Sequence, residues 1–135
     1  MKKQLLLSLL TLSLFTIGCS GNDDDSTPQQ NNPVQNQYFS PPTWIQGSWR
    51  VGNTSYYKFT NDDFIYVMNG TSYKAILTQS ANSGQTAKVD ETITNTDYNF
   101  VITAGASSSS YKFKKISSTQ IQWVNGVNNI TLDKE

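Results

Sequence analysis

The feature that most constrains the fold is the alternation of apolar and polar side chains from residue 43 onward. Seven of the nine leucines lie between residues 5 and 14, and only Leu77 and Leu132 follow them. Threonine, tyrosine, valine, isoleucine and phenylalanine dominate the later chain, and these residue types favour strands over helices. Residues 43–135 therefore predict an antiparallel sheet with one apolar face.

Two Asn-Gly pairs, Asn69-Gly70 and Asn125-Gly126, lie between runs that are rich in strand-forming residues. Such pairs are typical of two-residue hairpin turns. A tight turn at each pair sorts apolar side chains onto one face. The predicted cross-strand pairs are Met68 with Thr71, Tyr66 with Tyr73, Phe64 with Ala75, Val124 with Val127, Trp123 with Asn128 and Ile121 with Ile130.

Further strands are expected between turn-forming clusters, and together with the hairpins they give about eight short strands in meander order. This number and spacing predict an all-β fold, a small antiparallel up-and-down β-barrel. The expected further strands cover residues 48–51, 55–60, 86–94, 98–103 and 110–116.

The chain begins with a short cationic start, Lys2 and Lys3, followed by an apolar run over residues 5–17. A membrane-spanning helix needs about 20 residues, so this shorter run indicates a removable secretory signal. Gly18 and Cys19 follow the run directly, and Cys19 is the only cysteine.

Residues 16–19 resemble a bacterial lipoprotein lipobox, in which a small residue precedes the cysteine. The resemblance implies signal cleavage between Gly18 and Cys19 and acyl chains on Cys19, which would then hold the protein in a membrane. An inert thiol is the alternative interpretation of Cys19.

A polar cluster behind Cys19 resembles the surface-export signal of Bacteroidetes lipoproteins, in the form found in flavobacteria. The resemblance implies an outer-membrane lipoprotein exposed at the cell surface. A solvated tether, with the protein facing the periplasm, is the alternative. The residues of this cluster are Ser20, Asp23, Asp24 and Asp25.

Residues 20–42 are rich in Asn, Gln, Pro and Ser, with Val34, Tyr38 and Phe39 as their sizeable apolar residues. Such a stretch buries too little surface to offset its ordering entropy, so it predicts a disordered tether. The expected organisation is a signal peptide over residues 1–18, an acylated cysteine and tether over 19–42, and a β-barrel domain over 43–135.

Within the folded part, a Gly-x-Trp at the first strand and a Thr-Asp-Tyr at a late turn resemble two sequence signatures of lipocalins and related calycins. The signature positions are Gly47, Trp49, Thr96, Asp97 and Tyr98. The resemblance implies a barrel in which Trp49 plugs one end. The family's late arginine, which stacks on this tryptophan, is absent, and Lys134 is the nearest late cation. Ordinary core packing and turn chemistry are the alternatives.

An eight-stranded barrel either fills its interior with side chains or holds one small ligand. One interpretation is therefore a lipid-anchored envelope protein that binds a small apolar or glycan-like ligand. The alternative is a structural or protein-interaction lipoprotein, inhibitor-like, with a filled barrel. The ligand-lining candidates, which core packing would equally explain, are Tyr57, Phe59, Tyr66, Tyr73, Phe100 and Trp123.

Composition argues against catalysis and against a metal or cofactor site. The chain has no histidine and one cysteine, which excludes Ser-His and Cys-His mechanisms and cysteine-rich zinc sites. Asp90 and Glu91 are adjacent in a predicted strand and point to opposite faces. Asp62 and Asp63 lie in a turn without EF-hand spacing.

Charge balance argues against a nucleic-acid partner. The chain has 10 basic and 10 acidic side chains, and removal of the signal peptide would leave a slight acidic excess. The sequence thus predicts a non-enzymatic protein whose membrane contact is Cys19, and it names no protein partner.

Overall fold

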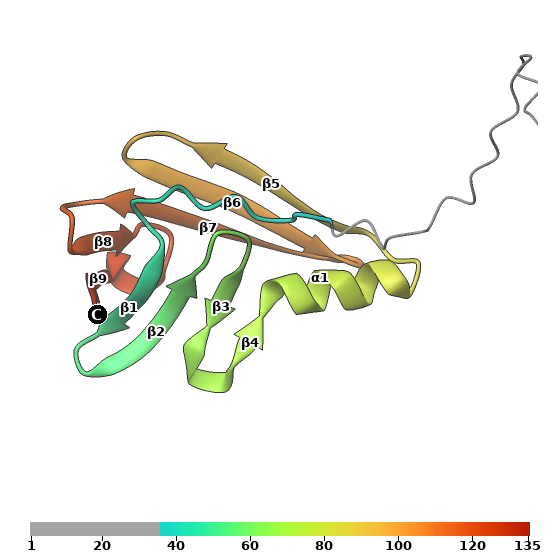
Figure 1. Ribbon diagram of the computed structural model, residues 1–135, viewed down its shortest axis with the longest axis horizontal. Helices are drawn as coiled ribbons and strands as arrows, with labels where there is room; N and C mark the ends of the chain where they lie inside the picture. The colour runs from blue at the N-terminus through green and yellow to red at the C-terminus, as the bar shows by residue number, and fades with distance from the viewer. Residues whose placement is uncertain (1–35) are drawn as a thin grey trace, which may run out of the picture. The chain divides into compact units, whose positions relative to one another are not determined.

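Nine antiparallel strands form one curled sheet in the computed structural model, which describes residues 36–135 (Figure 1). The strand order is β4-β3-β2-β1-β9-β8-β7-β6-β5. The predicted all-β antiparallel fold is confirmed. The closed barrel is not, because β4 and β5 do not pair and the sheet remains a half-barrel.

The elements follow the chain as a meander interrupted once by a helix. The strands are β1 (Gly47–Val51), β2 (Thr54–Phe59), β3 (Phe64–Tyr66), β4 (Thr71–Ser72), β5 (Ala87–Ile93), β6 (Asp97–Ala104), β7 (Ser107–Lys115), β8 (Gln120–Trp123) and β9 (Thr131–Lys134). The helices are α1 (Tyr73–Asn82) and two 3-10 turns, η1 (Val67–Asn69) and η2 (Val127–Asn129). None of the helices found in residues 36–135 combines the length and the apolar character that crossing a bilayer requires.

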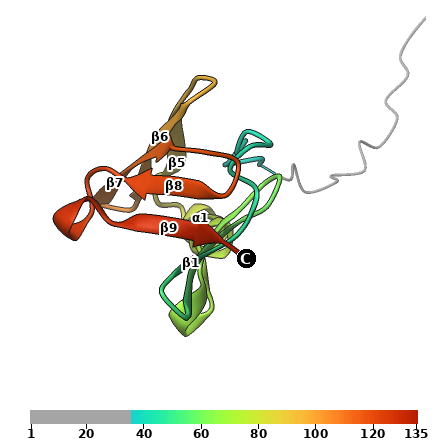
Figure 2. The same cartoon turned by 90° about the vertical axis from the view of Figure 1, so that its left-hand side faces the viewer.

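The strands predicted outside the two hairpins are confirmed to within a few residues as β1, β2, β5, β6 and β7. Pairing of β9 with both β1 and β8 joins the two halves of the sheet, and Figure 2 shows these three strands in succession. The ends of the chain's meander therefore lie in the middle of the sheet.

The hairpin predicted at Asn69-Gly70 is wrong in its turn and in its second strand, because η1 lies between β3 and β4 and Met68 does not pair with Thr71. Tyr66 pairs with Thr71 and not with Tyr73, because the chain turns into helix α1 at Tyr73. Ser72 is the N-cap, and its hydroxyl oxygen accepts a hydrogen bond from the backbone N–H of Ala75 at 3.0 Å. Such a cap satisfies a backbone donor that the first helical turn leaves without a partner.

The hairpin predicted at Asn125-Gly126 has the right face and the wrong register. Ile121 pairs with Leu132 and not with Ile130, because η2 widens the turn. A shift of two residues keeps every side chain on its own face. Ile121 and Leu132 are accordingly both fully buried.

Residues 36–46, here called the N-terminal strap, belong to the folded unit. Phe39 and Ile45 are fully buried, and the Phe39 ring meets the Phe100 ring edge-on at 5.7 Å. The tether boundary predicted at residue 42 therefore lies too late in the chain. The polar composition around Phe39 predicted a disordered tether, although Phe39 is a core residue.

Polar contacts hold the strap between helix α1 and strand β5. The backbone N–H of Ser40 donates to the Glu91 carboxylate at 2.9 Å. The Tyr38 hydroxyl donates to the Leu77 carbonyl in α1 at 3.4 Å. The strap thus contacts elements on both sides of the gap that the sheet leaves open.

Aromatic rings fill most of the interior. The largest fully buried side chains include Trp49, Phe59, Phe64, Tyr98, Phe100 and Phe113, besides Phe39 of the strap. Within residues 36–135, no buried side-chain nitrogen or oxygen lacks a hydrogen-bond partner. The core therefore combines dense ring packing with complete polar pairing.

We expect Phe39→Ala to lower the free energy of unfolding by about 3–5 kcal/mol, the usual cost of removing a buried phenylalanine side chain. Urea denaturation of the full chain measures this change. Asn36→Ala, at an exposed strap position, is the matched control and should be nearly neutral. Equal stabilities of the two variants would show that the strap is not part of the core.

Candidate functional site

The six side chains predicted to line a ligand site lie in one aromatic cluster, where they pack against one another. Tyr57, Phe59 and Phe100 are buried, and the rings of Tyr57 and Trp123 meet edge-on at 5.4 Å. Phe64 stacks on Tyr73 with ring centroids 4.9 Å apart. Each of the six side chains therefore packs against other rings of the cluster.

A β-bulge in β2 brings an additional ring to the concave face. Trp49 pairs with Tyr57, while the next residue, Arg50, pairs with Ser55, so Tyr56 is an extra residue between the two pairs. Bulges re-aim side chains in this way. The Tyr56 ring meets the ring of its chain neighbour Tyr57 edge-on at 4.8 Å, although neighbouring side chains of a regular strand point to opposite faces.

Tyr56 joins two further half-buried rings, and we call Tyr56, Tyr66 and Trp123 the aromatic end. The Tyr56 ring lies 5.3 Å from Tyr66 and 6.3 Å from Trp123. The Tyr66 hydroxyl donates to the Met68 sulfur at 3.2 Å, and Met68 is 58% exposed. The ring cluster therefore extends from the core to the surface.

Burial governs the acid–base chemistry of the ring cluster. Desolvation raises the pKa of Tyr57 and Tyr111 far above the usual value of 10.0, and for Tyr111 the hydrogen bond with Tyr73 adds to this effect. Desolvation, followed by the nearby Tyr66, raises the pKa of Tyr56. These phenols therefore stay neutral at physiological pH.

Trp49 of β1 lies in the core, and three neighbouring residues set its surroundings. Its ring is fully buried, and its Nε1–H donates to the Ile45 carbonyl at 2.6 Å. The Lys134 ammonium lies 5.3 Å from the ring centroid, where the resemblance expects an arginine. Gly47 has φ +123°, and a Cβ there would lie 2.9 Å from Lys134 Cε. Gly47 thus leaves room for the lysine stem.

The second signature forms the β5–β6 turn. The Asp97 carboxylate accepts a hydrogen bond from the Thr96 hydroxyl at 2.7 Å, and the Asp97 N–H donates to Thr94 Oγ1 at 2.8 Å. Tyr98 is fully buried and donates to Glu91. Burial and this hydrogen bond raise the pKa of Tyr98 well above its usual range. Thr96 and Asp97 therefore act in turn formation, and Tyr98 in the core.

The acidic pairs serve structure and do not converge. Asp63 is buried and accepts from the Lys74 backbone N–H at 2.9 Å, so it caps α1 rather than standing in a solvated turn. Asp62 forms an ion pair with Lys74, whose hydrogen bond lowers the Asp62 pKa. Asp90 and Glu91 point to opposite faces of β5. Residues 36–135 contain no group of three metal-ligating side chains.

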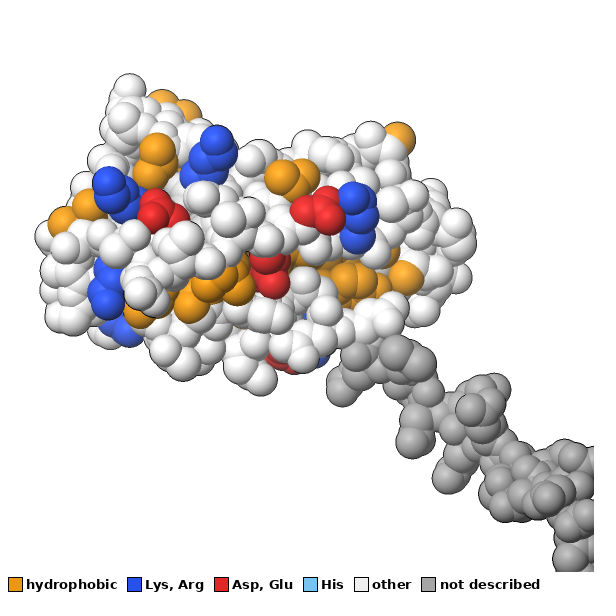
Figure 3. All heavy atoms as spheres, turned by 90° about the horizontal axis from the view of Figure 1, so that it is seen from above, with side chains coloured by type: hydrophobic (Ala, Val, Ile, Leu, Met, Phe, Trp, Pro, Cys, Tyr) orange, Lys and Arg blue, Asp and Glu red, His pale blue; other side chains and the backbone are white. Residues whose placement is uncertain are grey.

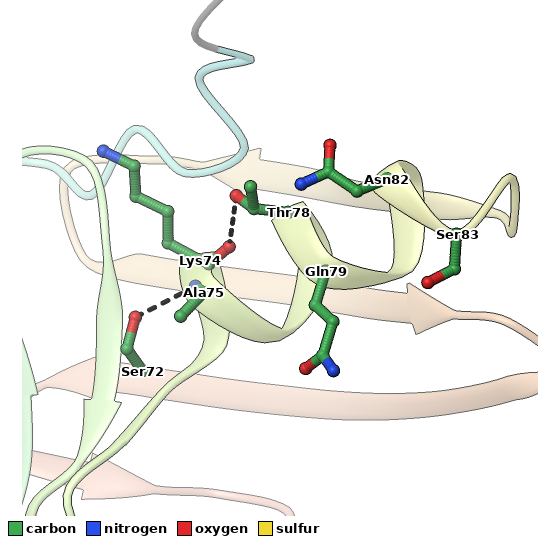
Figure 4. A pocket seen from close by; sticks show the side chains of 7 residues that line it. All are labelled: Ser72, Lys74, Ala75, Thr78, Gln79, Asn82 and Ser83. Carbon is green, nitrogen blue, oxygen red and sulfur yellow. Dashed lines mark hydrogen bonds between the residues drawn. The ribbon is translucent and has the colours of Figure 1, made fainter.

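A surface hollow lies along α1, and Figure 4 shows the side chains that line it. Its volume is about 460 Å³, and it is shallow and open. The residues that line it are Ser72, Lys74, Ala75, Thr78, Gln79, Asn82 and Ser83. None of the six predicted ligand-lining residues borders it.

The lipoprotein residues, Gly18, Cys19, Ser20 and the three aspartates, lie outside the described residues. Sequence reasoning missed Tyr56 and Tyr111 in the ring cluster. Tyr56 stands out only as a neighbour of Tyr57, and no local pattern reveals the bulge that turns it inward.

Comparison with known proteins assigns no family. No protein-family model matches the chain, and no curated sequence and no solved structure matches it either. The resemblance to lipocalins therefore stays a prediction.

We expect the stability of the protein to fall as the pH rises above 10. Tyr57, Tyr98 and Tyr111 have raised pKa values in the folded state, so above pH 10 the unfolded chain loses their protons first. Each such group removes up to about 1.4 kcal/mol of stability per pH unit. Absorbance at 295 nm and denaturation between pH 8 and about 12 test this. Ionisation of every tyrosine near pH 10 without loss of stability would contradict the buried cluster.

Proposed function

We propose that this protein is a non-catalytic, lipid-anchored envelope lipoprotein whose lipocalin-like half-barrel acts as an interaction module with a filled interior. The observation that carries the proposal is the packing of the six candidate ligand-lining rings among themselves and their neighbours. The neighbouring ring of Phe64, for example, stacks on Phe59 and Tyr73 and meets Phe100 edge-on. The distances between ring centroids are 5.0, 4.9 and 5.2 Å.

Dense packing argues against a ligand in the interior. Protein interiors are packed to the density of organic crystals, so a ligand there would have to displace rings from the core. Recognition is then left to the outer surface, the strand edges and the loops. This favours the interaction role over a carrier of small molecules.

Strand connectivity supports the lipocalin-like part of the proposal. Apart from β4 and β5, strands that are neighbours in sequence pair with each other, and β9 returns to pair with β1. This is the order of an up-and-down barrel in which one seam, between β4 and β5, is left open and α1 is inserted. The contact between Lys134 and Trp49 adds a second point of likeness.

Support for the lipid anchor comes from the sequence alone. The cationic start, the apolar run, Gly18 and the single Cys19 agree with a lipobox. Two or three acyl chains would hold the protein durably in a membrane, since each buried CH₂ contributes about 0.8 kcal/mol. Ser20 and the aspartates favour export to the outer surface of the outer membrane over a periplasm-facing position.

Metabolic labelling with an alkyne palmitate tests the anchor. We expect the wild-type chain to carry label in the membrane fraction, and Cys19→Ala to lose both label and membrane attachment. Asp97→Asn, in the β5–β6 turn, should keep the label and is the control. An unlabelled wild-type chain that still carries Met1 would contradict the anchor and leave the fold unaffected.

The aromatic end favours a second candidate function, the binding of a small apolar or glycan-like ligand at the surface. Tyr56, Tyr66 and Trp123 are half-buried rings with polar tips, a combination common at binding surfaces. Met68 adds an exposed thioether beside them. Such a ligand would lie on the rings and not inside the half-barrel.

Titration with the apolar fluorophore N-phenyl-1-naphthylamine separates the two functions. A filled interior predicts no saturable fluorescence gain with the wild-type chain. Saturable binding that Tyr56→Ala reduces at least tenfold, while Tyr38→Ala does not, would support the second candidate. Saturable binding that neither variant changes would indicate an internal site and contradict the filled interior.

A further inference from the structure

Strand β5 has one fully paired side and one free side. The Thr94 N–H donates to the Asp97 carbonyl at 2.8 Å, and the Gly105 N–H donates to the Thr86 carbonyl at 2.7 Å. Because antiparallel ladders alternate, the even-numbered residues of β5 bond to β6. The backbone groups of the odd-numbered residues point to the other side. These residues are Ala87, Val89, Glu91 and Ile93.

That other side is unpaired within the described part of the chain. β5 pairs with β6 alone, and none of the four odd-numbered residues makes a backbone hydrogen bond on the free side. The strap bonds here to the Glu91 side chain and, through Trp44 Nε1, to the Thr94 carbonyl. A seven-residue unpaired strand is a template for another strand.

The opposite edge of the sheet offers no comparable template. β4 has two residues, Thr71 and Ser72, and a very short edge strand cannot hold a ladder. β5 is longer, and Ile93 near its end is 44% exposed. Figure 3, seen from above, shows separate patches of hydrophobic side chains with acidic and basic groups between and beside them.

The charged side chains on the outer face of β5 would match those of a second, antiparallel β5 strand. Lys88 and Asp90 lie on the outer face, 57% and 61% exposed, and pair with each other at 2.7 Å. In an antiparallel pair of β5 strands centred on Val89, Lys88 of each strand lies opposite Asp90 of the other. Centring on Lys88, Asp90 or Glu91 instead places like charges directly opposite, which is destabilising.

We propose that β5 is a self-association edge, at which two copies of this chain pair their β5 strands antiparallel about a two-fold axis at Val89. Lys88 of each copy then faces Asp90 of the other, so the existing ion pairs become a four-charge network. A two-fold interface uses the same patch on both copies, as this charge pattern requires.

Glu91 does not oppose this pairing. Edge strands often avoid association through a charge that points inward. Here the Glu91 carboxylate is already satisfied by the Ser40 N–H and the Tyr98 hydroxyl. In the proposed register it stands beside Ala87 of the second copy, a small uncharged residue. The proposal depends on neither the lipid anchor nor the filled interior.

Charge reversal with the full chain, in detergent at large molar excess, tests the register. We expect Lys88→Asp and Asp90→Lys each to weaken self-association about tenfold in sedimentation equilibrium, because each converts two attractive cross-strand pairs into repulsive ones. An equimolar mixture of the two variants should recover the affinity, since every facing pair is then oppositely charged. Lys58→Asp, an exposed charge reversal on β2, is the control and should leave association unchanged.

Val89→Pro tests the backbone part of the proposal. The Val89 N–H points to the free side, so proline removes a donor to the second copy and leaves the β5–β6 ladder intact. We expect a monomer with an unchanged circular dichroism spectrum. A wild-type chain that stays monomeric at all concentrations, a dimer indifferent to the charge reversals, or a mixture without recovery would each overturn the proposal.

Discussion

Contacts between aromatic rings across the concave face hold this fold together. The sheet does not close, so no continuous ladder of hydrogen bonds joins β4 to β5. Phe64 of β3 instead packs edge-on against Phe100 of β6 and Tyr111 of β7, at 5.2 and 4.9 Å. These contacts connect the two ends of the sheet through its interior. Aromatic rings bury large areas and prefer edge-on or offset geometry. A few of them can therefore hold the two ends of the sheet together, as hydrogen bonds between the first and last strands do in a closed barrel.

The open seam explains the elements that do not belong to the sheet. Helix α1 follows β4, and the strap crosses from α1 to β5, where Phe39 enters the core. Phe39 and Leu77, one from each element, are fully buried and belong to the core. Neither element pairs its backbone with β5, because the strap's bond goes to the Glu91 side chain. The core is therefore covered at the seam, while β5 pairs with β6 alone within the described residues.

Alternation and turn-forming residues predicted the strands and turns that depend on residues close together in the sequence. Gly52 and Gly105, with φ +59° and +61°, mark turns between strands that alternation had already identified. At Asn125-Gly126 the face was right although the register was not, since alternation has a period of two and cannot distinguish registers two residues apart. At Tyr73 alternation failed, because Ser72 and Asp63 together cap a helix and Asp63 comes from a preceding turn. The candidate rings were identified as inward-facing, but whether they would line a cavity depended on partners from distant strands.

The amino-acid sequence by itself determined the β class, the positions of most turns, the ring-rich core and the exclusion of Ser-His and Cys-His mechanisms and of cysteine-rich zinc sites. These features follow from residue type and from the spacing of residues that lie within a few positions of one another in the chain. The tertiary structure alone decided that the sheet stays open, that a bulge turns Tyr56 inward, that Lys134 lies over Trp49 and that one side of β5 is unpaired. Each of these depends on residues far apart in the chain. Their positions are set by the packing of the whole interior, which no local pattern encodes.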